Sequence, residues 1–310
     1  MDAAVSRSCE VRPRGLVAAL NRTSHALWHT HRLIDSMKHI KVTAGLGYEL
    51  TDATPFILQI AAARNSHQSV QQENLTIEPA VPWREGATVN GNRCYRFTAQ
   101  PGALNIFYEA RVQLHVDVAS PSYLHERANA ELPDEVLEFL NPSRYCESDR
   151  LLDFATTQFG ASSPGYSRVE AVVSWVNKHL SYTPGATHVS TTACDVMQQK
   201  AGVCRDYAHL TIALCRALGI PARYVAGYAV DLEPPDFHGF CEVYLGSSWY
   251  LFDATGLAPV NSLVRITTGR DAADTSFASF VGRADFQPPE VMAIMESNDK
   301  APDSGPVSTA

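Results

Sequence analysis

Residues 204–254 contain the pattern that most constrains the fold, an apolar helix followed by three strands. The helix is predicted over 204–218, and it ends cleanly because Gly219 and Pro221 come directly after it. Runs rich in β-branched and aromatic residues then predict three strands, at 222–230, 240–245 and 248–254. A buried helix that packs against neighbouring strands is typical of an α+β domain.

Three residues with catalytic side chains lie at the ends of these elements. Cys204 opens the helix after Gly202, where free backbone N–H groups and the positive end of the helix dipole favour a thiolate. His238 lies just before the second strand, and Asp253 lies near the end of the third. A two-residue hairpin loop at 246–247 would make His238 and Asp253 diagonal neighbours on one face. This order predicts a thiol nucleophile, its base and a residue that orients the base.

Each of these residues also has a structural interpretation. Most cytosolic cysteines are buried and inert, but the polar neighbour Arg205 makes that interpretation less suited to Cys204. Asp253 would otherwise cap the turn that follows it, and His238 would be a residue at a strand end. A structural metal site that uses Cys204 and His238 lacks enough ligands with proper spacing.

Three more residues are candidates for lining a substrate cleft, with a core or surface role as the alternative for each: Trp175, Tyr182 and Asp206. His209 lies five residues past Cys204 and off its helix face, which favours a structural role. The sequence leaves open whether three later residues shape the cleft or pack the end of the domain: Arg270, Asp271 and Asp274.

The bulk composition narrows the class of protein. A net charge of −8 argues against nucleic acid or an anionic membrane as the partner, and no apolar run approaches the ~20 residues that span a bilayer. The seven cysteines have no regular spacing and no Cys-x-x-Cys pair, so they predict neither a disulfide framework nor a zinc site. Reduced thiols in a cytoplasmic protein are the simpler interpretation, and no cofactor or metal is predicted.

The chain divides into four predicted segments. Residues 1–36 contain five Arg and no Lys and lack the apolar core of a secretory signal, so they are predicted as a disordered tail or an over-long start. Short strands separated by turn residues predict an antiparallel β module over 37–120. Residues 121–285 switch to helical periodicity and form the predicted catalytic domain, and 286–310 are predicted as a loose tail.

Several segments resemble the motifs of one family. Residues 202–210, Gly-Val-Cys-Arg-Asp-Tyr-Ala-His-Leu, resemble the Cys motif of the transglutaminase-like (transglutaminase–protease) superfamily. Residues 238–244 and 249–255 resemble that family's His and Asp motifs, in the same order and with matching spacings. The β module is similar to the N-terminal region of bacterial members, and 265–274 is similar to their tail motif. The likeness covers most of residues 38–285.

The resemblance implies a papain-like α+β catalytic fold with Cys204 as nucleophile, His238 as base and Asp253 as orienter. The implied reaction is acyl transfer through a thioester, with the oxyanion near the backbone N–H of Cys204. No second oxyanion donor is identified from the sequence.

The resemblance leaves the acyl acceptor open. Water would make the chain a cysteine peptidase or amidase, which many bacterial members resemble, whereas an amine would make it a transglutaminase. The expected partner in both cases is a peptide or amide substrate. A non-catalytic binding module of the same fold is the remaining alternative, although the intact Cys, His and Asp argue against it. The sequence lacks the calcium-ligand cluster that some animal transglutaminases use.

Overall fold

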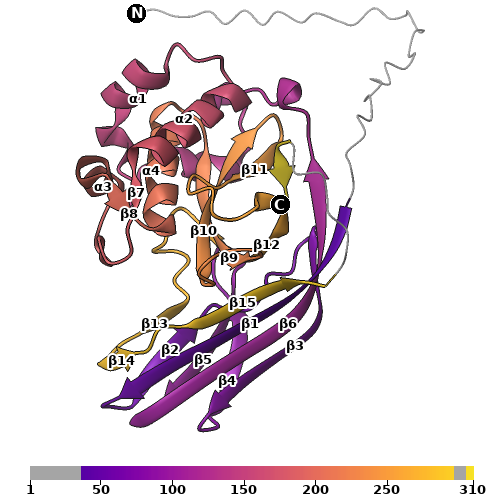
Figure 1. Ribbon diagram of the computed structural model, residues 1–310, viewed down its shortest axis with the longest axis vertical. Coiled ribbons are helices and arrows are strands. Elements are labelled where there is room, and N and C mark those ends of the chain that lie inside the picture. Colours follow the sequence, from indigo (N-terminus) through magenta and orange to yellow (C-terminus); the bar gives the residue numbers. More distant parts are fainter. Residues whose placement is uncertain (1–35, 297–304) are drawn as a thin grey trace, which may run out of the picture. The chain divides into compact units, whose positions relative to one another are not determined.

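The protein is described here by a computed structural model that covers residues 36–296 and 305–310 (Figure 1). The prediction of a disordered tail or an over-long start concerns residues outside these ranges, apart from Ser36. Two long strands, β1 (Ser36–Leu50) and β6 (Gly102–Val118), pair antiparallel from end to end. Buried residues alternate with more exposed ones along β6, as expected for a strand with one face on a core.

The β module is antiparallel, as the sequence predicts, and it is built from two sheets. β3 (Gln68–Glu78) extends the first sheet by pairing with β6. The second sheet contains four strands, in the order β13 (Ala278–Phe280), β2 (Thr54–Leu58), β5 (Arg93–Ala99) and β4 (Trp83–Ala87). Aromatic rings fill the space between the sheets: Phe56 stacks on Phe97 with centroids 5.2 Å apart and meets Tyr48 edge-on. These contacts give the module its own packed core.

The prediction of a loose tail over 286–310 is wrong for most of the described part of that segment. β14 (Ala284–Phe286) and β15 (Glu290–Met295) both pair with β1, and β16 (Val307–Ser308) lies between β11 and β6. Val291 of β15 is buried in the core of the β module, and this burial stabilises the strand. The polar composition of the segment gives no sign of such a strand.

The catalytic domain predicted over 121–285 combines four α-helices with strands that continue the first sheet. The helices are α1 (Leu152–Phe159), α2 (Tyr166–His179), α3 (Ala193–Gln199) and α4 (Cys204–Ala217). The main strands are β9 (Ala222–Ala229), β10 (Phe237–Leu245), β11 (Ser248–Phe252) and β12 (Leu263–Gly269). A short parallel pair joins β7 (Ser181–Tyr182) to β8 (Ala201–Gly202). The 3₁₀ turns are Pro121–Tyr123, Asn129–Glu131, Asp134–Leu140, Ser148–Arg150 and Val260–Ser262.

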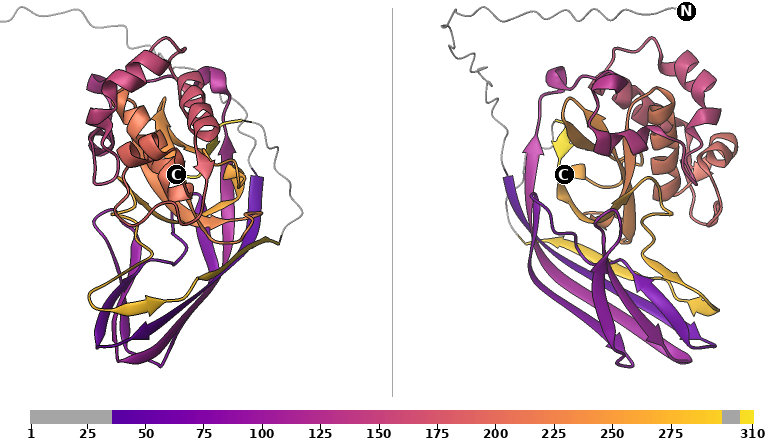
Figure 2. Two further views of the ribbon diagram at one scale, coloured as in Figure 1. Left: turned by 60° about the vertical axis from the view of Figure 1, so that its left-hand side comes forward. Right: turned by 180° about the vertical axis from the view of Figure 1, so that it is seen from behind.

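Strands β9 and β10 have a different core on each face. The helices gather on one side of these strands, where Ala226 and Cys241 join the helical core around α4 (Figure 2). On the other side, Val225 and Phe240 join the core of the β module. The hairpin register inferred from the sequence is confirmed, because Leu245 pairs with Ser248 across β10 and β11.

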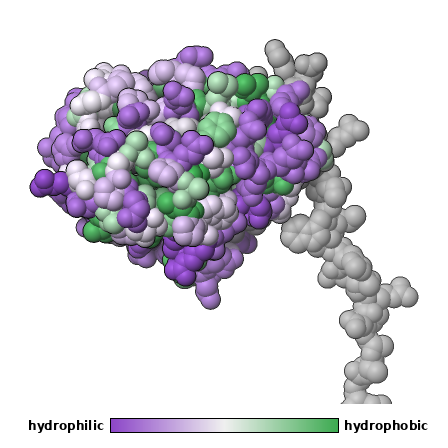
Figure 3. Space-filling model, turned by 90° about the horizontal axis from the view of Figure 1, so that it is seen from below, coloured by the Kyte–Doolittle hydropathy of each residue, from purple (hydrophilic) through white to green (hydrophobic). Residues whose placement is uncertain are grey.

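The surface seen in one view carries a mixture of hydrophobic and hydrophilic residues. Hydrophobic residues are interspersed with hydrophilic ones on the face seen from below (Figure 3). Within the described ranges, no helix is both long enough and apolar enough to cross a bilayer. The fold is therefore α+β, with an N-terminal antiparallel β module followed by a helix-covered sheet.

Candidate active site

Cys204 is the first residue of α4, and the turn before it is fixed by Asp206. The Asp206 carboxylate accepts hydrogen bonds from the backbone N–H of Val203 at 2.9 Å and from the hydroxyl of Thr187 at 2.6 Å. A side chain at Gly202 would place its Cβ 2.6 Å from the Cβ of Asp206, so this close turn requires glycine. Among the cysteines that the structure describes, five are buried and Cys204 is half-buried.

His238 and Asp253 meet across the β10–β11 hairpin. The Nε2 atom of His238 lies 3.0 Å from Oδ2 of Asp253, and both side chains are almost completely buried. The carboxylate is held from behind, because it accepts hydrogen bonds from the N–H and hydroxyl of Thr255 and from the N–H of Ala258. These contacts fix the carboxylate against Nε2 of the imidazole.

The Cys204 side chain lies beside His238. Both residues line one cavity, and Cys204 contributes to the shift in the pKa of His238. Because Asp253 engages Nε2, the atom left for the thiol is Nδ1, which is buried and has no hydrogen-bond partner among the described residues. The thiol, the imidazole and the carboxylate therefore lie near one another.

The surroundings favour the charged forms of His238 and Asp253. Burial lowers the pKa of His238, but its contacts with Asp253 and Cys204 outweigh burial and raise the pKa to about 10. Burial raises the pKa of Asp253, but the hydrogen bonds from His238 and Thr255 outweigh it and hold that pKa below its usual value. An imidazolium beside the thiol is the charge distribution that stabilises a thiolate.

The cavity beside Cys204 and His238 has a volume of about 480 Å³ and mainly apolar walls. One wall is the segment 272–277, which follows β12, and Phe277 stacks there on Phe237 with centroids 4.0 Å apart. Val189 and Tyr145 form another part of the lining. The site can thus hold an apolar group next to the thiol.

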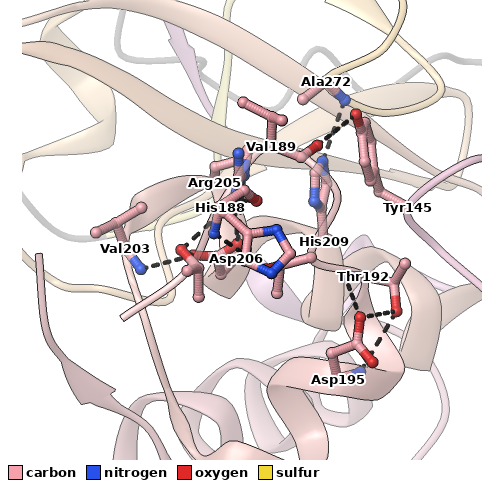
Figure 4. Close-up of polar contacts among 12 residues, drawn as sticks. Tyr145, His188, Val189, Thr192, Asp195, Val203, Arg205, Asp206, His209 and Ala272 are labelled. Atoms are coloured by element: carbon pink, nitrogen blue, oxygen red, sulfur yellow. Dashed lines mark hydrogen bonds and ion pairs between the residues drawn. The ribbon is translucent and has the colours of Figure 1, made fainter. Parts of the chain in front are cut away.

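His209 connects these two parts of the lining (Figure 4). Its Nε2 atom accepts a hydrogen bond from the N–H of Ala272 at 3.1 Å, and its ring stacks on Tyr145 with centroids 5.1 Å apart. The Tyr145 hydroxyl then donates to the carbonyl of Val189 at 2.8 Å. Complete burial lowers the pKa of His209 to about 3, so the ring stays neutral and can accept this hydrogen bond. This arrangement agrees with the structural role expected from its position on the helix.

The β module also holds the 272–277 wall in place. Gln59 donates its backbone N–H to the carbonyl of Phe277 at 2.7 Å and its side-chain amide to the carbonyl of Ser276 at 3.0 Å. Asn92 exchanges two hydrogen bonds with the backbone of Thr268, at the end of β12. Two elements distant in sequence thus fix both ends of the wall.

The structure answers the question left open for Arg270, Asp271 and Asp274. Asp271 is buried and accepts hydrogen bonds from the backbone N–H groups of Tyr145 and Ala273, both of which line the cavity. Arg270 and Asp274 form an ion pair with each other, on the more exposed side of the same turn. Asp271 therefore shapes the cavity, and the other two stabilise the turn.

The three candidates for substrate binding lie in different surroundings. Tyr182 is absent from the cavity lining, but it lies near Cys204, and burial raises the pKa of its phenol. Asp206 is completely buried and acts as the cap described above, so its carboxylate has no exposed surface. Trp175 is absent from the cavity lining and stacks on His179, with centroids 4.1 Å apart. Only Tyr182 of these candidates lies near the thiol.

One property of the site is not evident from the sequence. The wall formed by 272–277 depends on Gln59, which no local pattern connects with residues more than two hundred positions away. Within residues 36–296 and 305–310, no group of three or more His, Cys, Asp or Glu side chains is arranged to hold a metal ion. The chemistry that this geometry offers is that of a thiol, an imidazole and a carboxylate.

Comparisons with known proteins agree with this fold and arrangement. Residues 153–254 match the model of the transglutaminase-like superfamily, and residues 37–128 match that of the bacterial transglutaminase N-terminal domain. A crystal structure from Cytophaga hutchinsonii, described as a "putative cysteine protease", is 37% identical, with a TM-score of 0.87. The match covers 90% of this chain and 100% of that one.

Mycobacterial relatives match a shorter region. An uncharacterized protein of Mycobacterium leprae is 29% identical over 152 residues, which are 46% of this chain and 54% of the relative. An uncharacterized protein of Mycobacterium tuberculosis is 29% identical over 150 residues, 44% of this chain and 47% of the relative. The chain thus spans about half the length of the curated relatives it matches. Together with the full-length structural match, these findings show that the chain belongs to the transglutaminase-like superfamily.

Proposed function

We propose that the protein is a thiol-dependent acyl-transfer enzyme that hydrolyses an amide or peptide bond through Cys204, His238 and Asp253. The observation that carries the proposal is the position of His238, whose Nε2 binds the Asp253 carboxylate and whose unpartnered Nδ1 leaves it free to take a proton from Cys204, which lines the same cavity. The family contains both cysteine proteases and transglutaminases, so acyl transfer is the chemistry that its members share.

The first half-reaction forms a thioester. His238 takes the thiol proton, and the Cys204 sulfur attacks the carbonyl carbon of the substrate. The carbonyl oxygen becomes an oxyanion, which accepts a hydrogen bond from the backbone N–H of Cys204 at the start of α4. The C–N bond then breaks, and the departing amine takes its proton from the His238 imidazolium.

Tyr182 is the residue that we assign as the second oxyanion donor. The backbone N–H of Cys204, beside which the carbonyl oxygen of a substrate would lie, influences the pKa of this phenol and so lies near it. Burial raises the pKa of this phenol, so it keeps the proton that it would donate. A substrate carbonyl between the two groups would accept hydrogen bonds from both.

The second half-reaction releases the acyl group. A water molecule gives one proton to neutral His238 and attacks the thioester carbonyl, and the C–S bond breaks to leave a carboxylic acid and the free thiol.

Amine transfer, which would make the protein a transglutaminase, differs only in the nucleophile of this step. A non-catalytic binding module is the alternative from another class. We propose a reducing cytoplasm as the compartment, and the lack of a disulfide among the six described cysteines supports this.

The test combines thiol reactivity with turnover. The alkylation rate of Cys204 by iodoacetamide, followed by peptide mass spectrometry against pH, should be high below pH 7 and should fall in His238→Ala. A peptide library incubated with the wild type should gain new termini that are absent with Cys204→Ala. Monodansylcadaverine attached to glutamine would instead identify amine transfer. An ordinary thiol titration, near pH ~8.5 and indifferent to His238, would favour the binding module.

A further inference from the structure

The charge of the cavity beside Cys204 is uneven. Of the described residues that line it, Arg205 is the one with a permanently charged side chain, and no Asp or Glu lines it. The other lining residues are largely apolar, and Asp206, the carboxylate that pairs with Arg205, is not among them. A ligand group that enters this cavity meets a positive charge next to the thiol.

The guanidinium of Arg205 is held by one edge. Its Nε and Nη2 atoms donate to Oδ1 of Asp206 at 3.3 and 2.9 Å, and Nη2 also donates to the carbonyl of His188 at 2.9 Å (Figure 4). Asp206 is completely buried, so it anchors the guanidinium without entering the cavity. Nη1 makes no hydrogen bond within the described part of the chain. The arrangement therefore leaves a fixed N–H donor pair available to a ligand.

A second donor comes from Tyr224, on β9. The residue is 4% exposed, lines the cavity and packs against the ring of His209. Its hydroxyl lies directly over Gly239, where an added Cβ would come within 2.3 Å of the oxygen. No described residue accepts a hydrogen bond from this hydroxyl. Burial raises the pKa of Tyr224 well above its usual value, so the hydroxyl remains a donor.

The remaining side-chain hydroxyls of the cavity already have partners. Tyr145 donates to the carbonyl of Val189, Thr275 to that of Asp271 and Ser276 to that of Ala278. Apart from Cys204 and His238, Arg205 and Tyr224 are thus the lining residues whose side chains keep a donor without an acceptor. Both border the cavity, and a carboxylate can accept hydrogen bonds from a guanidinium and a phenol together.

We infer that the cavity binds a carboxylate of the substrate, through Nη1 of Arg205 and the hydroxyl of Tyr224. The inference rests on the proposed function and specifies its substrate class, peptides or amides with an anionic group near the bond that Cys204 attacks. An acidic side chain and a free C-terminal carboxylate present the same chemistry to these two donors. The charge-assisted hydrogen bonds select the anionic substrate over its neutral analogue.

The test uses alkylating reagents that differ only in charge, so no natural substrate is needed. One arm compares N-iodoacetylglycine, which ends in a carboxylate, with N-iodoacetylglycinamide. The other compares N-iodoacetyl-aspartic acid α-amide, which has only a side-chain carboxylate, with N-iodoacetyl-asparagine amide. Each reagent forms a thioether with Cys204 and releases iodide, and the ratio of the anionic to the neutral rate constant is measured by peptide mass spectrometry.

Four proteins are compared: the wild type, Arg205→Gln, Tyr224→Phe and Arg144→Gln. Arg144 is an exposed residue that stacks on Tyr145 without lining the cavity, so its replacement removes the same charge nearby. We expect the wild type to prefer the anionic reagent in at least one arm. Arg205→Gln should lower that ratio about tenfold, equivalent to about 1.4 kcal/mol, and Tyr224→Phe about threefold. Arg144→Gln should leave it unchanged.

Equal ratios in the wild type, Arg205→Gln and Tyr224→Phe, in both arms, would overturn the inference. Tyr224→Phe removes a single oxygen atom, so it keeps the test decisive if Arg205→Gln does not fold. Failure of the proposed function has a different signature, because Cys204 would then react slowly with all four reagents. The ratio within each pair would still report whether Arg205 and Tyr224 bind a carboxylate.

Discussion

Replacing Asp253 by Asn tests how the carboxylate controls the proposed base. In the wild type, Oδ1 accepts the N–H of Thr255 at 2.9 Å, whereas Oδ2 faces Nε2 of His238 at 3.0 Å and the N–H of Ala258 at 3.3 Å. An Asn side chain would keep its oxygen at the shorter backbone contact and turn its NH₂ toward His238. An amide N–H donated to Nε2 places the imidazole proton on Nδ1, where it prevents His238 from accepting the thiol proton.

The size of the effect follows from the pKa of His238. Its rise from 6.5 to about 10 is 3.5 units, and at about 1.4 kcal/mol for each unit the imidazolium is favoured by about 5 kcal/mol. If Asp253 supplies half of this, with the thiol supplying the rest, its loss costs about 2.5 kcal/mol, or roughly 60-fold in the ion-paired thiolate. The wrong tautomer adds to this loss, and turnover in comparable triads falls by on the order of 10⁴.

The assay follows iodoacetamide alkylation of Cys204 between pH 5 and 9, together with thermal unfolding of each protein. Asp253→Asn should react roughly 60-fold more slowly at pH 7 while remaining folded. The matched control is Asp236→Asn, because Asp236 is exposed and bonds to the N–H of Phe237 rather than to the imidazole. An alkylation profile that overlays the wild type would refute the assigned role of Asp253. An equal loss in Asp236→Asn would show that general charge, not orientation, is responsible.

Three further changes probe other parts of the site. Tyr182→Phe should lower kcat on an amide substrate about 100-fold without slowing iodoacetamide alkylation, which forms no oxyanion; unchanged kcat would contradict its assignment. Because the pKa of His209 is about 3 in the folded chain and near 6.5 when unfolded, the wild type should lose stability as the pH falls from about 6.5 to 3. Denaturant titrations of His209→Gln should lack this loss in the free energy of unfolding, which reaches about 1.4 kcal/mol per pH unit in the wild type. Parallel plots of that free energy against pH for the two proteins would argue against the low pKa of His209. Gln59→Ala should raise KM several-fold at constant kcat by loosening the wall at Ser276, whereas an unchanged KM would separate that wall from substrate binding.

The helix that begins at Cys204 could be predicted because its signals are local. Its apolar residues are contiguous in sequence, and Gly219 and Pro221 mark its end, so the predicted 204–218 differs by one residue from the observed Cys204–Ala217. The approach of His238 to Asp253 was also accessible, since a two-residue loop fixes the register of a hairpin. In both cases the information lies within a few residues of the feature.

The features that the sequence did not predict depend on contacts between distant segments. Apolar and polar residues alternate only weakly over 290–295. These residues form a strand because they pair with an edge of β1. Gln59 lies in a module without apparent catalytic residues, and its role is visible only once Ser276 is beside it. Tyr182 was a candidate for the cleft, but α3 and β8 separate it from Cys204, so its place near that residue rather than elsewhere needs the folded chain.

One family model ends at residue 128 and the other begins at residue 153. The two matched regions nevertheless pack against each other. The face of β9 and β10 that carries Val225 and Phe240 is covered by the β module, and Gln59 reaches from that module to the cavity wall. A core transplanted into another protein without the module would expose that face to water and lose a support of its cavity. Recombination that preserves the cavity must therefore move both segments together, and the whole described unit should melt in one transition.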